Sequence, residues 1–275
     1  MFPQISQITL IYLSGKSALS ARSAGNDKTM IKELEDYSWF PPMFRRYQAE
    51  YIGSLVIWLR IYRPLVSELE QLVRSTRPQF IQDLCSGSGI PAIYVQKQMK
   101  NIPQTMLSDK FPDTSFNDNA NLTYLKKSID AIWVVPDPHI CYTMYNAFHH
   151  FSSDQQKEMV NKMAVRKSPF LFAEILQPGV LTTIRIIFAA TILQLFTAPF
   201  IKPFSLKRLF FTYIIPVNLL TVLYDGIISV FKSRPAHYYR KLLEGSSDNG
   251  FVITIGQYNN WQGNLVFIKG TPAKA

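Results

Sequence analysis

The sequence predicts an α/β fold built on a doubly wound, mostly parallel sheet. Two observations carry this prediction: short strand-like apolar runs alternate with helical patterns between residues 80 and 175, and two strands of alternating character close the chain. Four segments follow: a poorly ordered arm at 1–29, helices and core at 30–176, an apolar helical insertion at 177–245, and a strand pair at 246–275 that completes the core. An antiparallel pair at the end of a parallel sheet is permitted.

The helices and strands are predicted from the spacing of apolar residues and from the residues that favour turns. A helical spacing of apolar residues before the first strand, broken at Pro41-Pro42 and at Pro64, predicts N-terminal helices. Ser153, with Gln156 three residues later, resembles a capping box that opens a further helix. The expected strands are Phe80–Cys85, Thr105–Ser108, Phe170–Ile175, Phe251–Ile255 and Asn264–Ile268, with Ala131–Val135 and Thr143–Phe148 as strand or loop candidates.

Composition narrows the class of partner. The 275 residues are 47% hydrophobic but only 17% charged, against about 25% in ordinary soluble domains. The net charge of +10 suggests an anionic partner, yet the basic residues form no run and no nucleic-acid motif is present. An anionic membrane surface is therefore expected, and nucleic acid is not. The two cysteines, Cys85 and Cys141, have no metal-ligand spacing, so no metal and no disulfide framework are expected.

The segment Asp83-Leu84-Cys85-Ser86-Gly87-Ser88-Gly89 carries the chemistry. A strand precedes it and a helix follows it, and its glycines allow a tight turn with a close approach to a ligand. Asp109 ends the next strand, 20 residues after Gly89, where a carboxylate can accept hydrogen bonds from both hydroxyls of a ribose. These features predict a site for a nucleotide-type cofactor.

Two cofactor classes fit this turn. Gly87, Gly89 and Ala92 satisfy the spacing of a dinucleotide fingerprint, which would suit a nicotinamide-dependent reductase. S-adenosylmethionine (SAM) is favoured because Asp83 precedes the turn and could meet an ammonium group, because helices precede the first strand, and because a strand pair ends the chain. A turn that binds no ligand is the remaining alternative.

The chain resembles class I SAM-dependent methyltransferases from Phe80 to about Ile175 and again from Phe251 to Pro272, including a membrane-associated bacterial subgroup with a hydrophobic insertion. That family has a Rossmann-like fold. The resemblance implies that the amino acid part of SAM contacts the glycine-rich turn, that Asp109 binds the ribose, and that Asp130 contacts the adenine amino group. The SAM-binding residues implied are Asp83, Cys85, Ser86, Gly87, Gly89, Asp109, Lys110, Phe111, Asp130 and Ala131. Cys85 stands where the family has its first glycine.

The run Met144–Phe151 follows the expected fourth strand and would face the transferred methyl group. His149 or His150 could accept a proton from a hydroxyl or an acidic carbon during methylation. Alternatively, both histidines are structural, since methyl transfer can require only alignment of acceptor and sulfonium. A non-catalytic SAM-fold scaffold within a biosynthetic complex is the second functional hypothesis.

Two apolar stretches, Val180–Phe200 and Leu209–Phe231, are each long enough to span a bilayer. Arg185, Pro216 and Asp225 disfavour a simple span, so helices lying in the cytoplasmic face of the membrane are expected. Residues 178–241 would form the membrane contact, and a soluble cap is the alternative. We expect a lipophilic small-molecule acceptor, methylated on oxygen more readily than on carbon. The basic residues expected to meet lipid headgroups are Lys202, Lys207, Arg208, Lys232, Arg234, Arg240 and Lys241.

Overall fold

The structure is a computed structural model that describes residues 31–100, 102–246, 250–260 and 263–273. A seven-stranded sheet has the order β3-β2-β1-β4-β5-β7-β6. Strands β1 to β5 are parallel, and β7 runs antiparallel to β5 and β6, as the sequence predicted. The strands are β1 (Phe80–Leu84), β2 (Gln104–Ser108), β3 (Leu122–Tyr124), β4 (Ile140–Tyr145), β5 (Phe170–Glu174), β6 (Phe251–Asn260) and β7 (Gly263–Pro272). The predicted arm at 1–29 lies outside the described residues.

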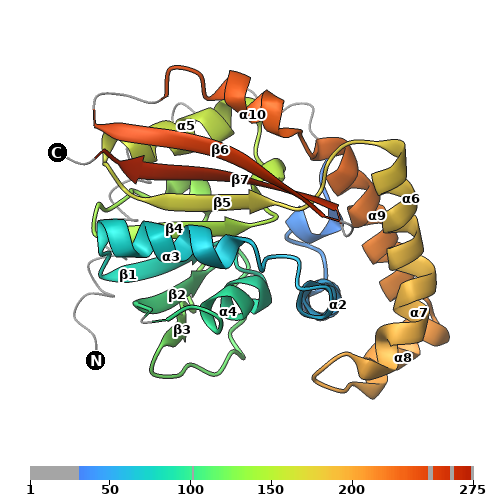
Figure 1. Cartoon of the computed structure of the whole chain (residues 1–275). Helices are drawn as coiled ribbons and strands as arrows, with labels where there is room; N and C mark the ends of the chain where they lie inside the picture. Colours follow the sequence, from blue (N-terminus) through green and yellow to red (C-terminus); the bar gives the residue numbers. More distant parts are fainter. Residues whose placement is uncertain (1–30, 101, 247–249, 261–262, 274–275) are drawn as a thin grey trace.

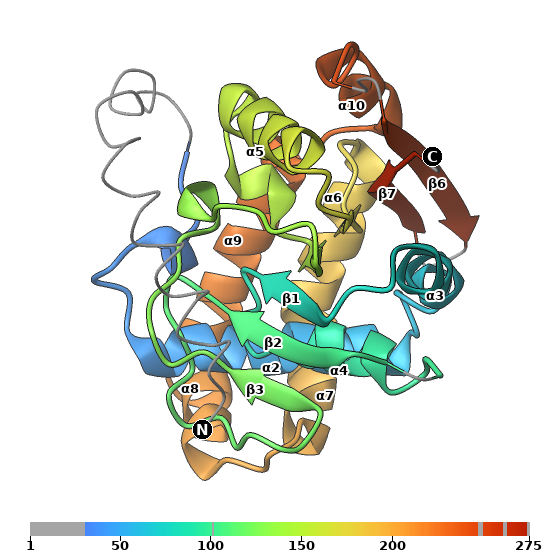
Figure 2. The same ribbon diagram turned by 90° about the vertical axis from the view of Figure 1, so that its left-hand side faces the viewer.

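The core lies on both faces of this sheet, because successive side chains of a strand point to opposite faces. Along β4, Tyr142 and Met144 pack under α5 and α10, whereas Cys141 and Tyr145 pack under α3 and α4. Figure 2 shows α5 and α3 on opposite sides of the sheet. The covering helices are α3 (Leu65–Thr76), α4 (Ile90–Gln96), α5 (Ser153–Val165) and α10 (Ala236–Leu242).

The carboxyl ends of the parallel strands face a third group of helices. Helix α2 (Pro42–Trp58) and the insertion helices lie beyond the arrowheads of β4 and β5 (Figure 1). A short 3-10 helix, η2 (Leu34–Asp36), and a second, η4 (Phe148–His150), contact α9 (Val217–Lys232) at this edge. The loops that follow β1, β2 and β4 therefore open toward the insertion, where open α/β sheets bind ligands.

The insertion leaves β5 and folds into one long helix followed by a bent pair. The long helix, Val180–Phe200, combines α6 (Val180–Phe188), a π-helix, α7 (Gln194–Thr197) and a 3-10 turn. It is apolar and long enough to cross a membrane, and 11% of its most apolar window is buried. The pair, α8 (Leu206–Tyr213) and α9 (Val217–Lys232), is bent by 75°. A helix that crosses a membrane in one straight segment would not have this bend.

Two residues expected to meet lipid headgroups are instead buried inside the protein. The guanidinium of Arg208 is 2.5 Å from Glu50 Oε2 and donates to the carbonyl of Ile201. The ammonium of Lys232 lies 2.9 Å from Glu33 Oε1. Burial of a charge is tolerated only with such a partner, so both side chains turn inward and the expectation was wrong for them.

Local differences from the sequence prediction are small. Ala131–Val135, a strand or loop candidate, contains a 3-10 helix over Ala131–Trp133, and the fourth strand begins before Thr143, at Ile140. The N-cap of α5 is Ser152, whose side chain accepts from the N–H of Gln155, so the capping box lies one residue earlier than predicted from Ser153 and Gln156. The three-residue edge strand β3 was not predicted.

Candidate active site

Hydrogen bonds hold the turn between β1 and α4 against the end of β2. The N–H of Ser86 donates to the carbonyl of Ser108 at 3.0 Å, and the N–H of Ser108 donates to Ser86 Oγ at 3.1 Å. Three residues of the turn, Cys85, Gly87 and Gly89, have φ values of 55°, 52° and 72°. Glycine adopts this left-handed region without strain, whereas a cysteine does so at a cost. The turn therefore has the backbone of a three-glycine loop with one side chain added.

The two glycines serve different purposes. A Cβ on Gly89 would lie 2.4 Å from Leu107 Cδ1, so this glycine allows α4 to pack against β2. A Cβ on Gly87 would meet nothing within 4 Å, and Gly87 forms part of the wall of a recess. The exposed backbone at Gly87 can thus be approached closely by a ligand.

Asp109 connects this turn to the next loop. Its Oδ2 accepts from the N–H of Gly87 at 2.8 Å, and its Oδ1 accepts from the N–H of Phe111 at 2.7 Å. Each carboxylate oxygen retains a second lone pair that can accept from a ligand hydroxyl. Burial raises the pKa of Asp109, and the two backbone N–H groups oppose that effect.

The structure brings most of the predicted cofactor residues around one recess of about 300 Å³, a volume at the lower end of small-molecule sites. At its far end Asp130 caps the following 3-10 helix and lies 3.3 Å from the ammonium of Lys110. The predicted residues in the wall are Cys85, Ser86, Gly87, Asp109, Lys110, Phe111, Asp130, Ala131 and His150.

Asp83, Gly89 and His149 were also predicted as site residues, but they lie behind this wall. The carboxylate of Asp83 is buried and accepts from Thr143 Oγ1 at 2.7 Å. Burial raises the pKa of Asp83 to about 7. Its contact with an ammonium group stays a prediction.

A second cavity, of about 490 Å³, adjoins the recess. Its walls are mainly apolar and come from α2 and the insertion, including Tyr51, Leu55, Ile186, Leu193 and Val222. Its polar lining residues include Glu33, Glu35, Asn146 and His150. Five residues line both spaces: Glu35, Ile52, Val56, Asn146 and His150. The recess and the apolar cavity therefore share one wall, and His150 stands in it.

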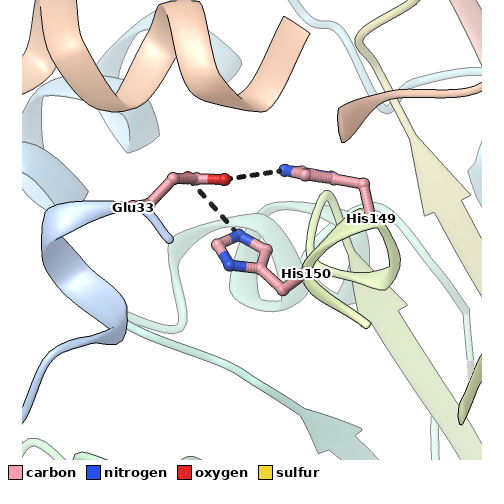
Figure 3. Close-up of side chains that lie close together, drawn as sticks. All are labelled: Glu33, His149 and His150. Atoms are coloured by element: carbon pink, nitrogen blue, oxygen red, sulfur yellow. Dashed lines mark ion pairs between the residues drawn. The ribbon is translucent and has the colours of Figure 1, made fainter. Parts of the chain in front are cut away.

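Behind this shared wall lies a buried network of charged side chains that contains both histidines (Figure 3). The Nδ1–H of His149 donates to Glu174 Oε2 at 2.6 Å, and the Nδ1–H of His150 donates to Asp36 Oδ1 at 2.9 Å. The Nε2 atoms of the two rings face opposite oxygens of Glu33, each at 3.6 Å.

The insertion completes this network from the other side. Helix α9 supplies Ser229 and Lys232, which bond to Glu33 at 2.8 and 2.9 Å, and Asp225, which accepts from Gln48 Nε2 at 2.9 Å. Sequence reasoning missed these partners, as well as Glu33 and Glu174. The sequence does mark two of these residues, because Glu174 and Asp225 are each the single charged residue within an apolar run.

The pKa values within the network reflect an excess of carboxylates. Burial would lower the pKa of His149, but Glu174 and Glu33 outweigh it and raise that pKa to about 10. Burial, together with Glu33, Asp225 and Asp36, raises the pKa of Glu35 to about 8 against the opposing effect of His150. The site therefore favours positive charge.

Comparisons with known proteins support the fold. The sequence matches no family model and no curated protein. Among solved structures, the plantazolicin methyltransferase BpumL, in complex with a monoazolic desmethylPZN analogue and S-adenosylhomocysteine (SAH), aligns over 98% of both chains with a TM-score of 0.50 and 11% identity. This likeness shows that the chain has the Rossmann-like methyltransferase fold.

Other matches are weaker in score. Human N-acetylserotonin methyltransferase in complex with SAM has a TM-score of 0.45 at 11% identity, and the alignment covers 98% of this chain and 69% of that one. The CMeT domain of citrinin polyketide synthase has a TM-score of 0.47 at 12% identity over 82% of this chain and 56% of its own. The chain spans only 43% of the LepI structure solved with SAM.

Proposed function

We propose that this chain binds SAM in the recess and transfers the methyl group to a lipophilic small molecule held in the apolar cavity. One observation carries the proposal: the nucleotide-type recess and the apolar cavity share a wall formed by Glu35, Ile52, Val56, Asn146 and His150. Methyl transfer requires the acceptor atom to be aligned with the sulfonium carbon, and two adjoining sites provide that alignment.

The recess suits the nucleoside portion of SAM. Asp109 presents free lone pairs toward a ribose, and Gly87 leaves room beside its backbone. Phe111 and Ala131 provide apolar surface beside Asp130, as expected for an adenine. The relatives solved with SAM or SAH have the same fold, which supports this choice of cofactor over a nicotinamide.

The apolar cavity suits the acceptor. Its walls are aliphatic and aromatic, whereas its polar end lies beside His150. An acceptor with an apolar body and one polar group would place that group beside the recess. An acceptor hydroxyl at this end of the cavity would lie beside His150 and the carboxylates of Glu33 and Glu35. We therefore propose methylation on oxygen rather than on carbon.

Isothermal calorimetry with SAH and with NADH tests the cofactor. We expect SAH to bind and NADH not to bind. Asp109→Ala should weaken SAH by roughly 10- to 100-fold, because hydrogen bonds to a charged group contribute about 1.5–3 kcal/mol. Asp154→Ala, which removes an exposed carboxylate on α5, is the matched control and should leave affinity unchanged. Binding of NADH alone would refute the proposal, and binding of neither would favour a scaffold.

The same proposal places the enzyme at the inner face of a membrane, in the cytoplasm. Much of the long insertion helix is exposed and apolar, with Leu181, Ile184, Phe188, Ile192 and Phe196 at 50% exposure or more. Contiguous apolar surface of this kind marks an interaction site. Arg185, Lys202 and Lys207 are exposed basic residues of the insertion, and two more, Arg240 and Lys241, are exposed on α10. A helix that lies in the lipid headgroup region would bring the opening of the acceptor cavity to its lipophilic substrate.

Fractionation after expression tests the membrane contact. We expect the full chain in the membrane fraction, released by detergent, and expect it to float with vesicles of phosphatidylcholine and phosphatidylglycerol. Replacing Ile192 and Phe196 together with glutamate should move the protein to the soluble fraction. Recovery of the unaltered chain as a monomer without detergent would contradict the membrane contact while leaving the cofactor proposal intact.

A further inference from the structure

The buried network contains three groups arranged as metal ligands. The ligand atoms of Glu33, His149 and His150 all lie within 4.8 Å of one another. They come from two separate elements: Glu33 precedes the 3-10 helix η2, and both histidines belong to η4. In Figure 3 dashed lines run from the carboxylate of Glu33 to both imidazole rings.

The rings are oriented as metal-binding histidines are. A histidine that ligates a metal through one nitrogen normally donates its other N–H to a carboxylate or carbonyl, which fixes the tautomer. Both rings meet this condition, because Nδ1 of His149 bonds to Glu174 and Nδ1 of His150 bonds to Asp36. Glu174 is itself held by the backbone N–H of Phe148 at 2.7 Å. Both Nε2 atoms are thus directed toward Glu33.

One of these nitrogens lacks a hydrogen-bond partner. His149 is 1% exposed, and its Nε2 makes no hydrogen bond to any residue that the structure describes. A buried polar atom left unsatisfied costs about 1–3 kcal/mol, so native proteins rarely retain one without a reason. A ligand between Nε2 and Glu33 would satisfy it.

The charges nearby also favour a cation. Four carboxylates, those of Glu33, Glu35, Asp36 and Glu174, lie within 3.6 Å of a ring nitrogen of one of the two histidines. Lys232 contacts two of these carboxylates, Glu33 and Asp36. Carboxylates thus surround both rings and would attract a cation bound at the Nε2 atoms.

We propose that Glu33, His149 and His150 bind one divalent transition-metal ion, with Glu174 and Asp36 holding the two rings in place. Two imidazoles and one carboxylate suit zinc, cobalt, iron(II) or manganese and leave coordination positions open. Glu33 and His150 line the acceptor cavity, so an open position would face it. There the ion would orient an acceptor oxygen toward the sulfonium. This role rests on the proposed function, whereas the binding site itself does not.

Cobalt(II) provides the test, because its visible absorption reports nitrogen ligation. The full chain is first treated with a chelator, returned to chelator-free buffer and titrated with Co²⁺, followed by displacement with Zn²⁺. We expect one equivalent to bind with new visible bands, and Zn²⁺ to abolish them. The alternative is that both rings are simply protonated. Absence of saturable binding in the unaltered chain would overturn the proposal, without reference to any variant.

Variants locate the ion. His149→Gln should abolish the cobalt bands, and Glu174→Gln should weaken binding about 10- to 100-fold, as loss of a supporting carboxylate does elsewhere. His237→Gln, at an exposed histidine on α10, is the matched control and should bind one equivalent. Unchanged bands in His149→Gln, with circular dichroism showing a folded protein, would overturn the site.

Calorimetry with SAH on the same samples separates this inference from the proposed function. SAH binding without metal binding would refute only the metal site. Metal binding without SAH binding would refute only the cofactor proposal.

Discussion

The buried carboxyl of Asp83 makes stability depend on pH in a direction that can be calculated. Burial raises its folded-state pKa from an ordinary value of 3.8 to about 7. Because the folded-state pKa is raised, the protonated carboxyl makes its full contribution to stability below about pH 4. This contribution falls steadily as the pH rises and is lost above about pH 7. Three pKa units correspond to about 4 kcal/mol in total, of which about 2 to 3 kcal/mol is lost between pH 5 and pH 8.

The replacement Asp83→Asn removes the titration but keeps an oxygen that can accept from Thr143 Oγ1. The assay is urea unfolding of both proteins at pH 5, 6, 7 and 8, because the difference between the two removes contributions from other titrating groups. Between pH 5 and pH 8, we expect the unfolding free energy of Asp83→Asn to rise by about 2 to 3 kcal/mol relative to that of the unaltered chain. A difference in unfolding free energy that is constant over this range would refute the reasoning.

Saturating SAH extends the same experiment to the cofactor. If the ammonium group of SAH approaches Asp83, the positive charge will lower the pKa of that carboxyl and reduce the pH dependence of the unaltered chain. SAH that binds without changing this pH dependence would show that Asp83 supports the turn but does not contact the ligand.

Three further predictions concern other parts of the molecule. Cys85→Gly should stabilise the fold by about 1 kcal/mol, since φ of 55° suits glycine, and a lower urea midpoint would contradict this. Arg208→Met should cost about 3–5 kcal/mol by leaving the buried Glu50 with only the exposed Arg46, 3.7 Å away, as a partner, and adding Glu50→Gln should restore much of the loss in a double-mutant cycle. Leu193→Trp should fill the apolar cavity and prevent binding of a fluorescent fatty acid, whereas Leu195→Trp, outside the cavity, should not.

The sheet was predictable because its signals are local. Strands β4 and β5 are buried on both faces and therefore appear as largely apolar runs. Strand β1 contains Gln82 and Asp83, and the glycine-rich turn that follows it marks its position. Strand β3 has three residues at the edge of the sheet and leaves no such run. The start of α5 was ambiguous because Ser152 and Ser153 are each followed by a glutamine three residues later, and only the hydrogen bond selects Ser152.

The sequence could also predict that residues such as Gly87 and Asp109 lie together, because they follow the ends of two neighbouring parallel strands. The charged network could not be predicted from the sequence. It joins Glu33, His149 and Lys232, which are separated by more than 80 residues at each step, and no periodicity relates them. The same limit explains the error over Arg208, whose partner Glu50 lies 158 residues away.

Helix α9 determines how far the insertion can be treated as a separate part. Asp225, Ser229 and Lys232 recur on one face of this helix, and all three bond to residues 33–36. Glu35 and Asp36 of that segment belong to the wall of the recess. Excising residues 177–245 would therefore not yield a smaller, working version of the protein. It would remove one side of the wall around the recess and leave the carboxylates of residues 33–36 without their partners on α9, so a shortened or less apolar form must keep α9 and change only the exposed apolar side chains of the insertion.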